Sequence, residues 1–268
     1  MRILLLFIIM GLLSCNGSET PETDPDIKSG STGIAAPQMI NYSILSEYPH
    51  DTSAYTQGLE FHKGKLLEST GDFEGSSLRI TDYKTGKVEQ IHKMGTAEIF
   101  GEGITVFKNK IYQLTWQNHQ VYVYDDKNIT QPIKTFQWPY EGWGIAHNDS
   151  LLIISDGTSN LYFVHPETFK VVNTVSVRDN NGTVNMLNEL EFVNGFVYAN
   201  VYETNYIVKI NPESGHVTGI INLPSLLKPA DVVPYRTNVL NGIAYDSTSK
   251  RFLITGKRWP KMFELQLN

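Results

Sequence analysis

The chain has 268 residues, a formal net charge of −6, 41% hydrophobic residues and 19% charged residues. This length holds one large all-β domain or two small ones, and the composition is ordinary for a globular protein with a core. The negative charge, without a basic stripe interleaved with aromatic residues, argues against a nucleic-acid-binding surface.

The N-terminal residues have the pattern of a targeting segment. Arg2 precedes an apolar run over residues 3–13, which is followed by Ser14 and Cys15. A positive start, a short apolar core and a small residue are typical of a secretory signal peptide. Residues 12–15 also resemble the lipobox of bacterial lipoproteins, which implies a signal peptide over residues 1–14 and a lipid on Cys15. An ordinary signal peptide with an incidental cysteine is the alternative.

The segment after the signal peptide predicts a tether. Cys15 is the single cysteine, so no disulfide forms within the chain. Residues 15–38 are rich in Ser, Thr, Gly, Pro and acidic residues and poor in apolar ones, a composition typical of disordered linkers. We therefore expect an exported lipoprotein of the bacterial cell envelope, facing the periplasm or the outer surface and attached to the membrane through its lipid alone.

A three-residue pattern opens a short apolar strand five times along the rest of the chain. Each copy has a polar or aromatic residue, then usually Gly, then Leu or Ile, and successive copies begin 45, 41, 45 and 53 residues apart. The opening residues are Gln57, Glu102, Trp143, Asn188 and Asn241. A period of about 40–50 residues in a β-rich chain is typical of a propeller with one four-stranded blade per repeat. We therefore predict an all-β, five-bladed β-propeller with antiparallel blades over residues 39–268.

Each repeat continues with a turn rich in Asn, Asp and Gly and then a second apolar strand, the pattern of a β-hairpin. The second strands are expected at Lys65–Thr70, Ile111–Trp116, Leu151–Ser155, Phe196–Tyr202 and Phe252–Lys257. The fifth repeat ends before its fourth strand, so we expect the N-terminal strand Ile40–Tyr48 to supply it and close the ring. Residues 224–239 are expected to form a loop or short helix over one face. A β-sandwich, which needs no such period, ranks below the propeller.

The propeller predicts where functional side chains gather. The first strand of each blade lines the central channel, so the start of the first strand and the end of the second meet at one mouth. The five opening residues form one predicted ring there, and a second ring comes from around Thr70, Trp116, Asp156, Tyr202 and Lys257. Opening residues that vary between repeats and meet in one place favour a built site over a purely structural repeat.

The sequence lacks the motifs that are typical of several kinds of catalytic site. The seven His are scattered, and no HExxH motif or Cys pair typical of a metal site is present. The chain has no GxSxG elbow and no glycine-rich phosphate loop. Proton transfer by one acid, Glu102, in an aromatic pocket with neutral hydrogen-bonding groups is the chemistry that remains.

Motifs in every repeat carry a family resemblance. In chain order they are Tyr55-Thr56-Gln57-Gly58-Leu59, Phe100-Gly101-Glu102-Gly103, Gly142-Trp143-Gly144, Ser155-Asp156-Gly157, Leu187-Asn188-Glu189-Leu190-Glu191, Leu240-Asn241-Gly242-Ile243 and Thr255-Gly256-Lys257-Arg258-Trp259-Pro260-Lys261. This set resembles the plant and bacterial, papaya-type glutaminyl cyclases. That resemblance implies a five-bladed propeller that converts the N-terminal Gln of peptides or proteins into pyroglutamate and releases ammonia. It implies no required cofactor or catalytic metal, while a structural ion in the channel stays open, and we expect a monomer.

The resemblance also implies roles for single residues. Glu102 and Lys257 are the expected catalytic residues. Desolvation by the indoles is expected to raise the pKa of Glu102, whereas direct contact with Lys257 would lower it, so we expect Lys257 to face the developing oxyanion. The expected substrate-binding residues are Gln57, Trp116, Trp143, Asn188, Tyr202, Phe100, Tyr55 and Asn241. Tyr202 departs from the plant enzymes, which have Trp at this place, so the shape of the pocket can differ.

Other interpretations stay open on the sequence alone. A non-catalytic propeller lipoprotein would bind a peptide or glycan at the same mouth. A metal-dependent, lactonase-like propeller would need several carboxylates and carboxamides around the channel. Glu102 could merely cap a turn, and Asn241 could merely satisfy backbone groups. Glu189 and Glu191 are expected to hold loops or pair with cations rather than act on substrate.

Overall fold

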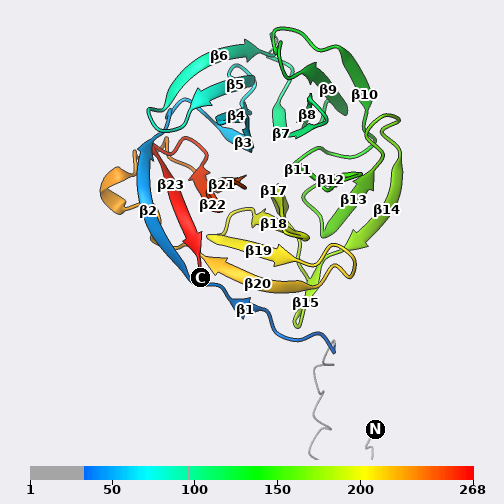
Figure 1. The fold of residues 1–268 in the computed structure, drawn as a ribbon, viewed down its shortest axis with the longest axis vertical. Coiled ribbons are helices and arrows are strands. Elements are labelled where there is room, and N and C mark those ends of the chain that lie inside the picture. Colours follow the sequence, from blue (N-terminus) through cyan, green and yellow to red (C-terminus); the bar gives the residue numbers. More distant parts are fainter. Residues whose placement is uncertain (1–32, 96) are drawn as a thin grey trace, which may run out of the picture. The chain divides into compact units, whose positions relative to one another are not determined.

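Five antiparallel sheets of four strands surround a common centre in the computed structural model (Figure 1). The structure describes residues 33–95 and 97–268, all within the compact unit Thr32–Asn268. The predicted signal peptide and Cys15 lie outside the described residues, as does the predicted tether up to residue 32, so these assignments stay predictions. Within the described ranges, no helix has the length and apolar character needed to cross a membrane.

The five sheets are the blades of the predicted propeller, and the first strand of each lies nearest the centre (Figure 1). Blade 1 contains β3 (Thr56–His62), β4 (Lys65–Thr70), β5 (Ser77–Asp82) and β6 (Lys87–Lys93). Blade 2 contains β7 (Gly101–Phe107), β8 (Lys110–Thr115), β9 (Gln120–Asp125) and β10 (Lys134–Gln137). Blade 3 contains β11 (Ile145–His147), β12 (Leu152–Ser155), β13 (Asn160–Val164) and β14 (Val171–Ser176). Blade 4 contains β17 (Leu187–Val193), β18 (Phe196–Val201), β19 (Tyr206–Ile210) and β20 (Val217–Asn222).

Blade 5 is completed by the N-terminal strand, as the sequence predicts. It contains β21 (Leu240–Asp246), β22 (Arg251–Gly256), β23 (Lys261–Leu267) and β2 (Tyr42–Pro49). β2 runs antiparallel to β23, from Tyr42 opposite Leu267 to Pro49 opposite Lys261. This pairing joins both ends of the propeller chain in one sheet and closes the ring. The predicted five-bladed fold is confirmed.

Short elements lie outside the four-stranded pattern. β1 (Gln38–Met39) adds to blade 4 by parallel pairing with β20, so Gln38, at the end of the predicted tether, takes part in a sheet. β15 (Arg178–Asp179) and β16 (Gly182–Thr183) form a small hairpin between blades 3 and 4 in the chain.

The 224–239 segment contains one turn of 3₁₀-helix, η1 (Pro229–Asp231). It lies beside blade 5, where Lys228 pairs with Glu47 of β2 and Asp231 pairs with Lys261 of β23 (orange in Figure 1). The segment therefore flanks the two strands that close the ring.

Burial decreases from the centre of the propeller outward. All seven residues of β7 are buried, whereas the outer strand β6 is mostly exposed. Hydrophobic clusters fill the spaces between neighbouring blades, and one of them joins Leu114 and Val121 of blade 2 to Ile145 and Ile154 of blade 3. Because removal of apolar surface from water dominates folding energetics, these contacts hold the blades against each other.

The glycine of the repeat lets the first strands approach closely around the centre. A Cβ added at Gly103 would lie 2.7 Å from the carbonyl oxygen of Trp143 and 2.8 Å from the backbone nitrogen of Ile145, both in the next repeat. At Gly58 and Gly144, an added Cβ would likewise overlap the backbone of the following blade. The glycine of the repeat therefore allows close packing of the first strands around the centre, which we call the hub.

Glu189 stands where the fourth repeat lacks this glycine. Its carboxylate accepts the backbone N–H of Leu59 in blade 1 at 3.1 Å and that of Ile243 in blade 5 at 2.8 Å. One buried side chain of blade 4 thus holds the first strands of two other blades.

Candidate active site

A cavity of about 280 Å³ opens at the mouth where the first strands begin. Its wall contains nine side chains from all five blades: Tyr55, Gln57, Phe100, Glu102, Trp116, Trp143, Asn188, Tyr202 and Lys257. All nine are among the site residues predicted from the sequence. The tenth, Asn241, is fully buried and does not line the cavity, nor do Thr70 and Asp156 of the predicted second ring.

Irregular backbone aims most of the opening residues at the mouth. The pairing register between the first and second strands shifts at Gln57, Glu102, Asn188 and Asn241. Such a bulge leaves a residue unpaired and turns its side chain out of the regular alternation. Trp143 instead precedes β11 and donates its backbone N–H to Ser155 O at 3.0 Å.

Aromatic rings form most of the cavity wall. Tyr55 packs edge-to-face on Phe100, with 6.0 Å between the ring centroids, and Phe100 packs in the same way on Trp116 at 5.7 Å. Across the cavity, Trp143 packs edge-to-face on Tyr202 at 5.6 Å. Edge-to-face pairs are favourable arrangements of aromatic rings, so each ring supports its neighbour.

Lys257 joins these two aromatic series. Its Nζ lies 4.8 Å from the centroid of the Tyr55 ring and 4.9 Å from that of Tyr202, and 2% of the residue is exposed. Burial lowers the pKa of Lys257 to about 8, against the Coulombic attraction of Glu102. Within the described residues, the two groups form no ion pair.

Glu102 is a buried carboxyl held by a relay of amides. Gln57 Nε2 donates to Glu102 Oε1 at 3.0 Å, and Asn241 Nδ2 donates to Gln57 Oε1 at 3.3 Å. Asn241 therefore orients the Gln57 amide from behind. Desolvation raises the pKa of Glu102 well above its ordinary value, an effect opposed by Lys257 and increased by Glu141. The carboxyl can therefore exchange a proton at a pH where a free Glu would be fixed as an anion.

Asn188 presents an unused hydrogen-bond acceptor beside the cavity. Its Oδ1 is buried and has no hydrogen-bond partner among the described residues. Because buried polar atoms are normally paired, this oxygen is available to an N–H group of a ligand.

Glu141 is a site residue that the sequence analysis missed. It lies between β10 and β11, and its Oε2 accepts the indole N–H of Trp116 at 2.7 Å and that of Trp143 at 3.0 Å. A carboxylate in a loop is ordinary in a sequence. Trp143 lies two positions further along the chain, but only the fold brings Trp116 to the same carboxylate.

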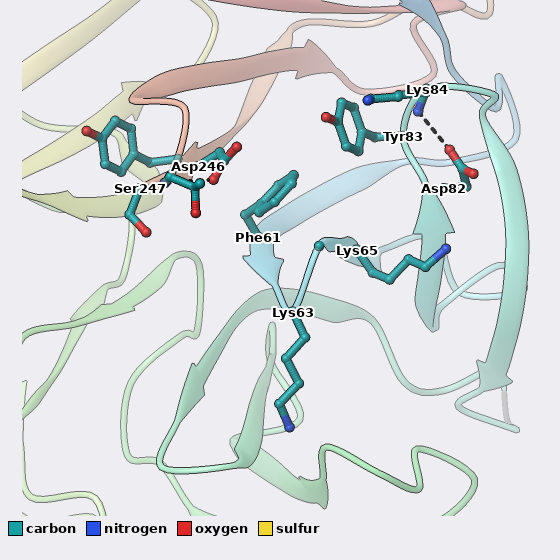
Figure 2. A pocket seen from close by; sticks show the side chains of 11 residues that line it. Phe61, Lys63, Lys65, Asp82, Tyr83, Lys84, Asp246 and Ser247 are labelled. Atoms are coloured by element: carbon teal, nitrogen blue, oxygen red, sulfur yellow. Dashed lines mark hydrogen bonds between the residues drawn. The ribbon is translucent and has the colours of Figure 1, made fainter.

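A second hollow, of about 520 Å³, lies at the opposite ends of the first strands (Figure 2). β3 begins beside Gln57 and ends at the 62–64 turn that borders this hollow. Lys63 points away from Phe61 and pairs with Asp126 at 2.6 Å, and Lys65 pairs with Glu89 at 2.7 Å. Lys63 and Lys65 are thus engaged with carboxylates, whereas the Nζ of Lys84, the third lysine of this wall, lies 5.8 Å from the centroid of the Tyr83 ring.

The cavity at the mouth has the charges that proton transfer needs. Its wall contains one carboxyl, Glu102, and one ammonium, Lys257. Among residues 33–95 and 97–268, no three His, Cys, Asp or Glu side chains gather so as to hold a metal ion. A desolvated carboxyl with a nearby cation can move protons and stabilise a negative oxygen.

Comparison with known proteins agrees with the sequence-based resemblance. A family model described as glutamine cyclotransferase matches residues 11–267. The glutaminyl-peptide cyclotransferase of Arabidopsis thaliana is 39% identical over 242 residues, which cover 89% of this chain and 75% of that protein. The crystal structure of Myxococcus xanthus glutaminyl cyclase is 35% identical, with a TM-score of 0.79, and the match covers 87% of this chain and 98% of that one. The predicted family resemblance is confirmed.

Proposed function

Because the chain belongs to the glutamine cyclotransferase family, we propose that it converts the N-terminal Gln of peptides or proteins into pyroglutamate and releases ammonia. The observation that carries this proposal is the desolvated carboxyl of Glu102, which shares an aromatic cavity with the ammonium of Lys257. This arrangement provides acid–base catalysis and charge stabilisation in one enclosed place.

The substrate supplies its own nucleophile in this reaction. The α-amine nitrogen of the N-terminal Gln forms a bond to Cδ of its own side-chain amide, which gives a five-membered ring bearing a negative oxygen. The attacking nitrogen loses a proton to the Glu102 carboxylate. Glu102 then gives this proton to the departing nitrogen as the bond from Cδ to that nitrogen breaks. The products are the pyroglutamyl peptide and ammonia, and Glu102 returns to its starting state.

The other cavity residues support this step. The ammonium of Lys257 is the group that stabilises the negative oxygen. The unpaired Oδ1 of Asn188 accepts an N–H of the substrate, which places the reacting end of the peptide. The rings of Trp116 and Trp143 enclose the Gln side chain and exclude water from the reacting atoms.

The proposed reaction proceeds without a metal ion. A metal would act as a Lewis acid that stabilises negative charge on the amide oxygen. Lys257, the cation that acts on Glu102 across the cavity, provides that stabilisation here.

An assay with a Gln-initiated dipeptide tests the proposal. Pyroglutamyl product and ammonia are measured with and without a chelator, and we expect equal amounts of both products and unchanged turnover in the chelator. Glu102→Gln is expected to lower kcat by about 10²–10⁴-fold, because it removes the proton-transfer group, with an unchanged circular dichroism spectrum. A peptide with acetylated N-terminal Gln lacks the attacking amine and serves as the negative control.

Each part of the proposal has its own contrary outcome. Near-normal turnover by the Glu102→Gln variant would show that Glu102 is not the proton carrier. Activity that is lost in chelator and restored by a divalent metal would contradict the metal-free mechanism. No ammonia from any Gln-initiated peptide would favour the alternative of a propeller that only binds a ligand at this mouth.

A further inference from the structure

The aromatic wall of the cavity has two breaks. Lys257 lies at the one between Tyr55 and Tyr202, and Glu141 lies behind the one between Trp116 and Trp143. Ring contacts run from Tyr55 through Phe100 to Trp116, and from Trp143 to Tyr202. Among the described residues, no ring contact joins the two indoles. The Oε2 atom of Glu141, which accepts both indole N–H groups, is what connects them.

The carboxylate of Glu141 is itself held in place. Its Oε1 accepts an N–H from Gln117 at 3.0 Å, and its backbone oxygen accepts the indole N–H of the buried Trp138 at 3.1 Å. Burial would raise the pKa of Glu141, but the hydrogen bonds from Gln117, Trp143 and Trp116 lower it. Glu141 is therefore an anion with a fixed orientation, and hydrogen bonds to an anion are stronger than neutral ones.

This arrangement decides what the two indoles present to a substrate. Each indole has a single N–H donor, and both donors are used at Glu141, which does not line the cavity. Ring surface alone is left for the substrate. Such walls exclude water and bind an amide side chain without competing for its hydrogen bonds.

We propose that Glu141 is a positioning residue of the cyclisation site, which sets the distance and angle between the Trp116 and Trp143 walls through one shared carboxylate oxygen. This inference rests on the proposed function for its effect on turnover. The geometry of the shared oxygen can be tested without any substrate.

Glu141 also acts on the proton carrier by its charge. Its carboxylate raises the pKa of Glu102, after the larger effect of desolvation, while Lys257 lowers it. The other titratable groups that face this cavity are Tyr55 and Tyr202, and His119 acts on Glu141 itself. Removing the charge of Glu141 should therefore move the acidic limb of the pH–rate profile to lower pH.

Two substitutions separate the two effects. Glu141→Gln removes the charge but keeps an acceptor oxygen, whereas Glu141→Leu removes both. Glu98→Gln removes an exposed carboxylate in the loop before β7 and is the matched control for charge. A substrate amine contributes equally to every profile measured with the same peptide.

The first measurement is the indole N–H spectrum by proton–nitrogen NMR. The chain has four tryptophans, so Trp→Phe variants assign the signals. In Glu141→Leu, the N–H signals of Trp116 and Trp143 should move upfield and exchange faster with solvent. In Glu141→Gln they should stay close to their wild-type positions, and the signal of Trp259, bonded to Asn238 O, should stay in both.

The second measurement is kinetic. Glu141→Leu should lower kcat/KM by roughly 10–100-fold, with a loss in kcat as well as a rise in KM, since misplacement of about 1 Å can cost 10²-fold. Glu141→Gln should have kcat/KM much closer to the wild-type value than Glu141→Leu has, but its acidic limb should lie at lower pH than that of the wild type. A purely structural role would not move the limb, and Glu98→Gln should change neither quantity.

The outcomes distinguish the two proposals. If Glu141→Leu leaves both indole signals and kcat/KM at wild-type values, the positioning role is wrong. If Glu141→Gln leaves the acidic limb in place, its charge does not act on the proton carrier. If the indole signals move as expected but the wild-type protein forms no pyroglutamate, the shared oxygen stands and the proposed function fails.

Discussion

Lys257 links burial of a single residue to the pH range of the proposed reaction. Burial among aromatic rings lowers the pKa of its ammonium to about 8. As the pH rises through this value, the amine becomes neutral and no longer stabilises a negative oxygen. We expect kcat to fall about tenfold per pH unit above pH 8. Lys257→Met should lower kcat by about 10²–10³-fold and abolish this descending limb, as a pH–rate profile will show.

Lys261 provides the control for this prediction. It lies four positions further along the chain and pairs with Glu47 and Asp231, each at 2.9 Å, outside the cavity wall. Lys261→Met should therefore keep the wild-type profile. A descending limb near pH 8 that survives in Lys257→Met would assign it to another group.

The position of a residue in the repeat predicts well whether it lines the cavity. It predicts poorly which residues support the cavity wall from behind. Trp116 and Lys257 are found because each directly follows a second strand, where the period of the repeat places it at the mouth. The repeat places Asn241 at the mouth as an opening residue of a first strand, but its amide donates to Thr56 O at 3.0 Å and to Gln57, so it supports the wall from behind. Glu141 has no periodic position, and its contacts with Trp116 and Gln117 depend on how loops of two blades meet.

At the scale of the strand, the close packing at the glycines of the hub can be tested by substitution. A methyl group at Gly103 would meet backbone atoms of the next repeat at 2.7–2.9 Å, and backbone at the centre of five packed sheets has little room to move. We expect Gly103→Ala to lower the unfolding free energy by about 1–3 kcal/mol or more through overpacking. Urea unfolding followed by tryptophan fluorescence measures this change.

Gly75 is the matched glycine for that test. A Cβ there would meet its nearest atoms at 3.6 and 3.7 Å, which is ordinary contact. Gly75→Ala should thus stay within about 0.5 kcal/mol of the wild type. Equal stability of the Gly103→Ala and Gly75→Ala proteins would mean that the first strands separate easily, contrary to the hub described above.

Strands were predictable to the extent that their signals are local. β4 covers Lys65–Thr70 as predicted, and β12 begins one residue after its predicted start, because a short apolar run next to turn residues marks both. The bulges at the opening residues were not predictable, since register is a property of two paired strands. The sequence did not predict β1 either, because its two residues are exposed and have no alternating pattern.

The whole ring depends on how the closing strand is fixed to blade 1. His50 directly follows β2, and its Nε2 lies 3.0 Å from Glu68 Oε1 of β4 while its Nδ1 lies 2.8 Å from Trp259 O of blade 5. Both ring nitrogens face acceptors, which only the protonated imidazole satisfies. Burial is the largest effect and opposes this charge, but Glu68, Trp259 O and Asp51 together outweigh it and raise the pKa of His50. For Glu68, burial is likewise outweighed by His50, Arg79 and Thr56 together, and the pKa is lowered.

The raised pKa of His50 gives the ring a definite pH dependence. The contribution of His50 to the unfolding free energy is fully present below its unfolded pKa of about 6.5 and is lost as the pH rises through the folded value. In Glu68→Gln the attraction of Glu68 is removed, and burial, the largest effect on His50, is opposed only by Trp259 O and Asp51. We expect the pKa of His50 to be lowered in this variant, so the sign reverses. We expect this variant to lose about 3–5 kcal/mol near pH 6, because the buried imidazole loses its partner and must either give up its proton or keep an uncompensated charge.

Unfolding in urea between about pH 5.5 and 8.5 tests this closure. The difference between wild type and Glu68→Gln cancels groups common to both, such as Glu60, whose pKa desolvation raises to about 8. We expect the difference to shrink as the pH rises, since the wild type loses the contribution of His50 while the variant regains it. Glu89→Gln, which removes an exposed pair with Lys65, should stay within about 1 kcal/mol of the wild type at every pH. A difference that is constant across this range would mean that His50 is neutral in the folded protein, and closure would then depend on the pairing of β2 with β23 alone.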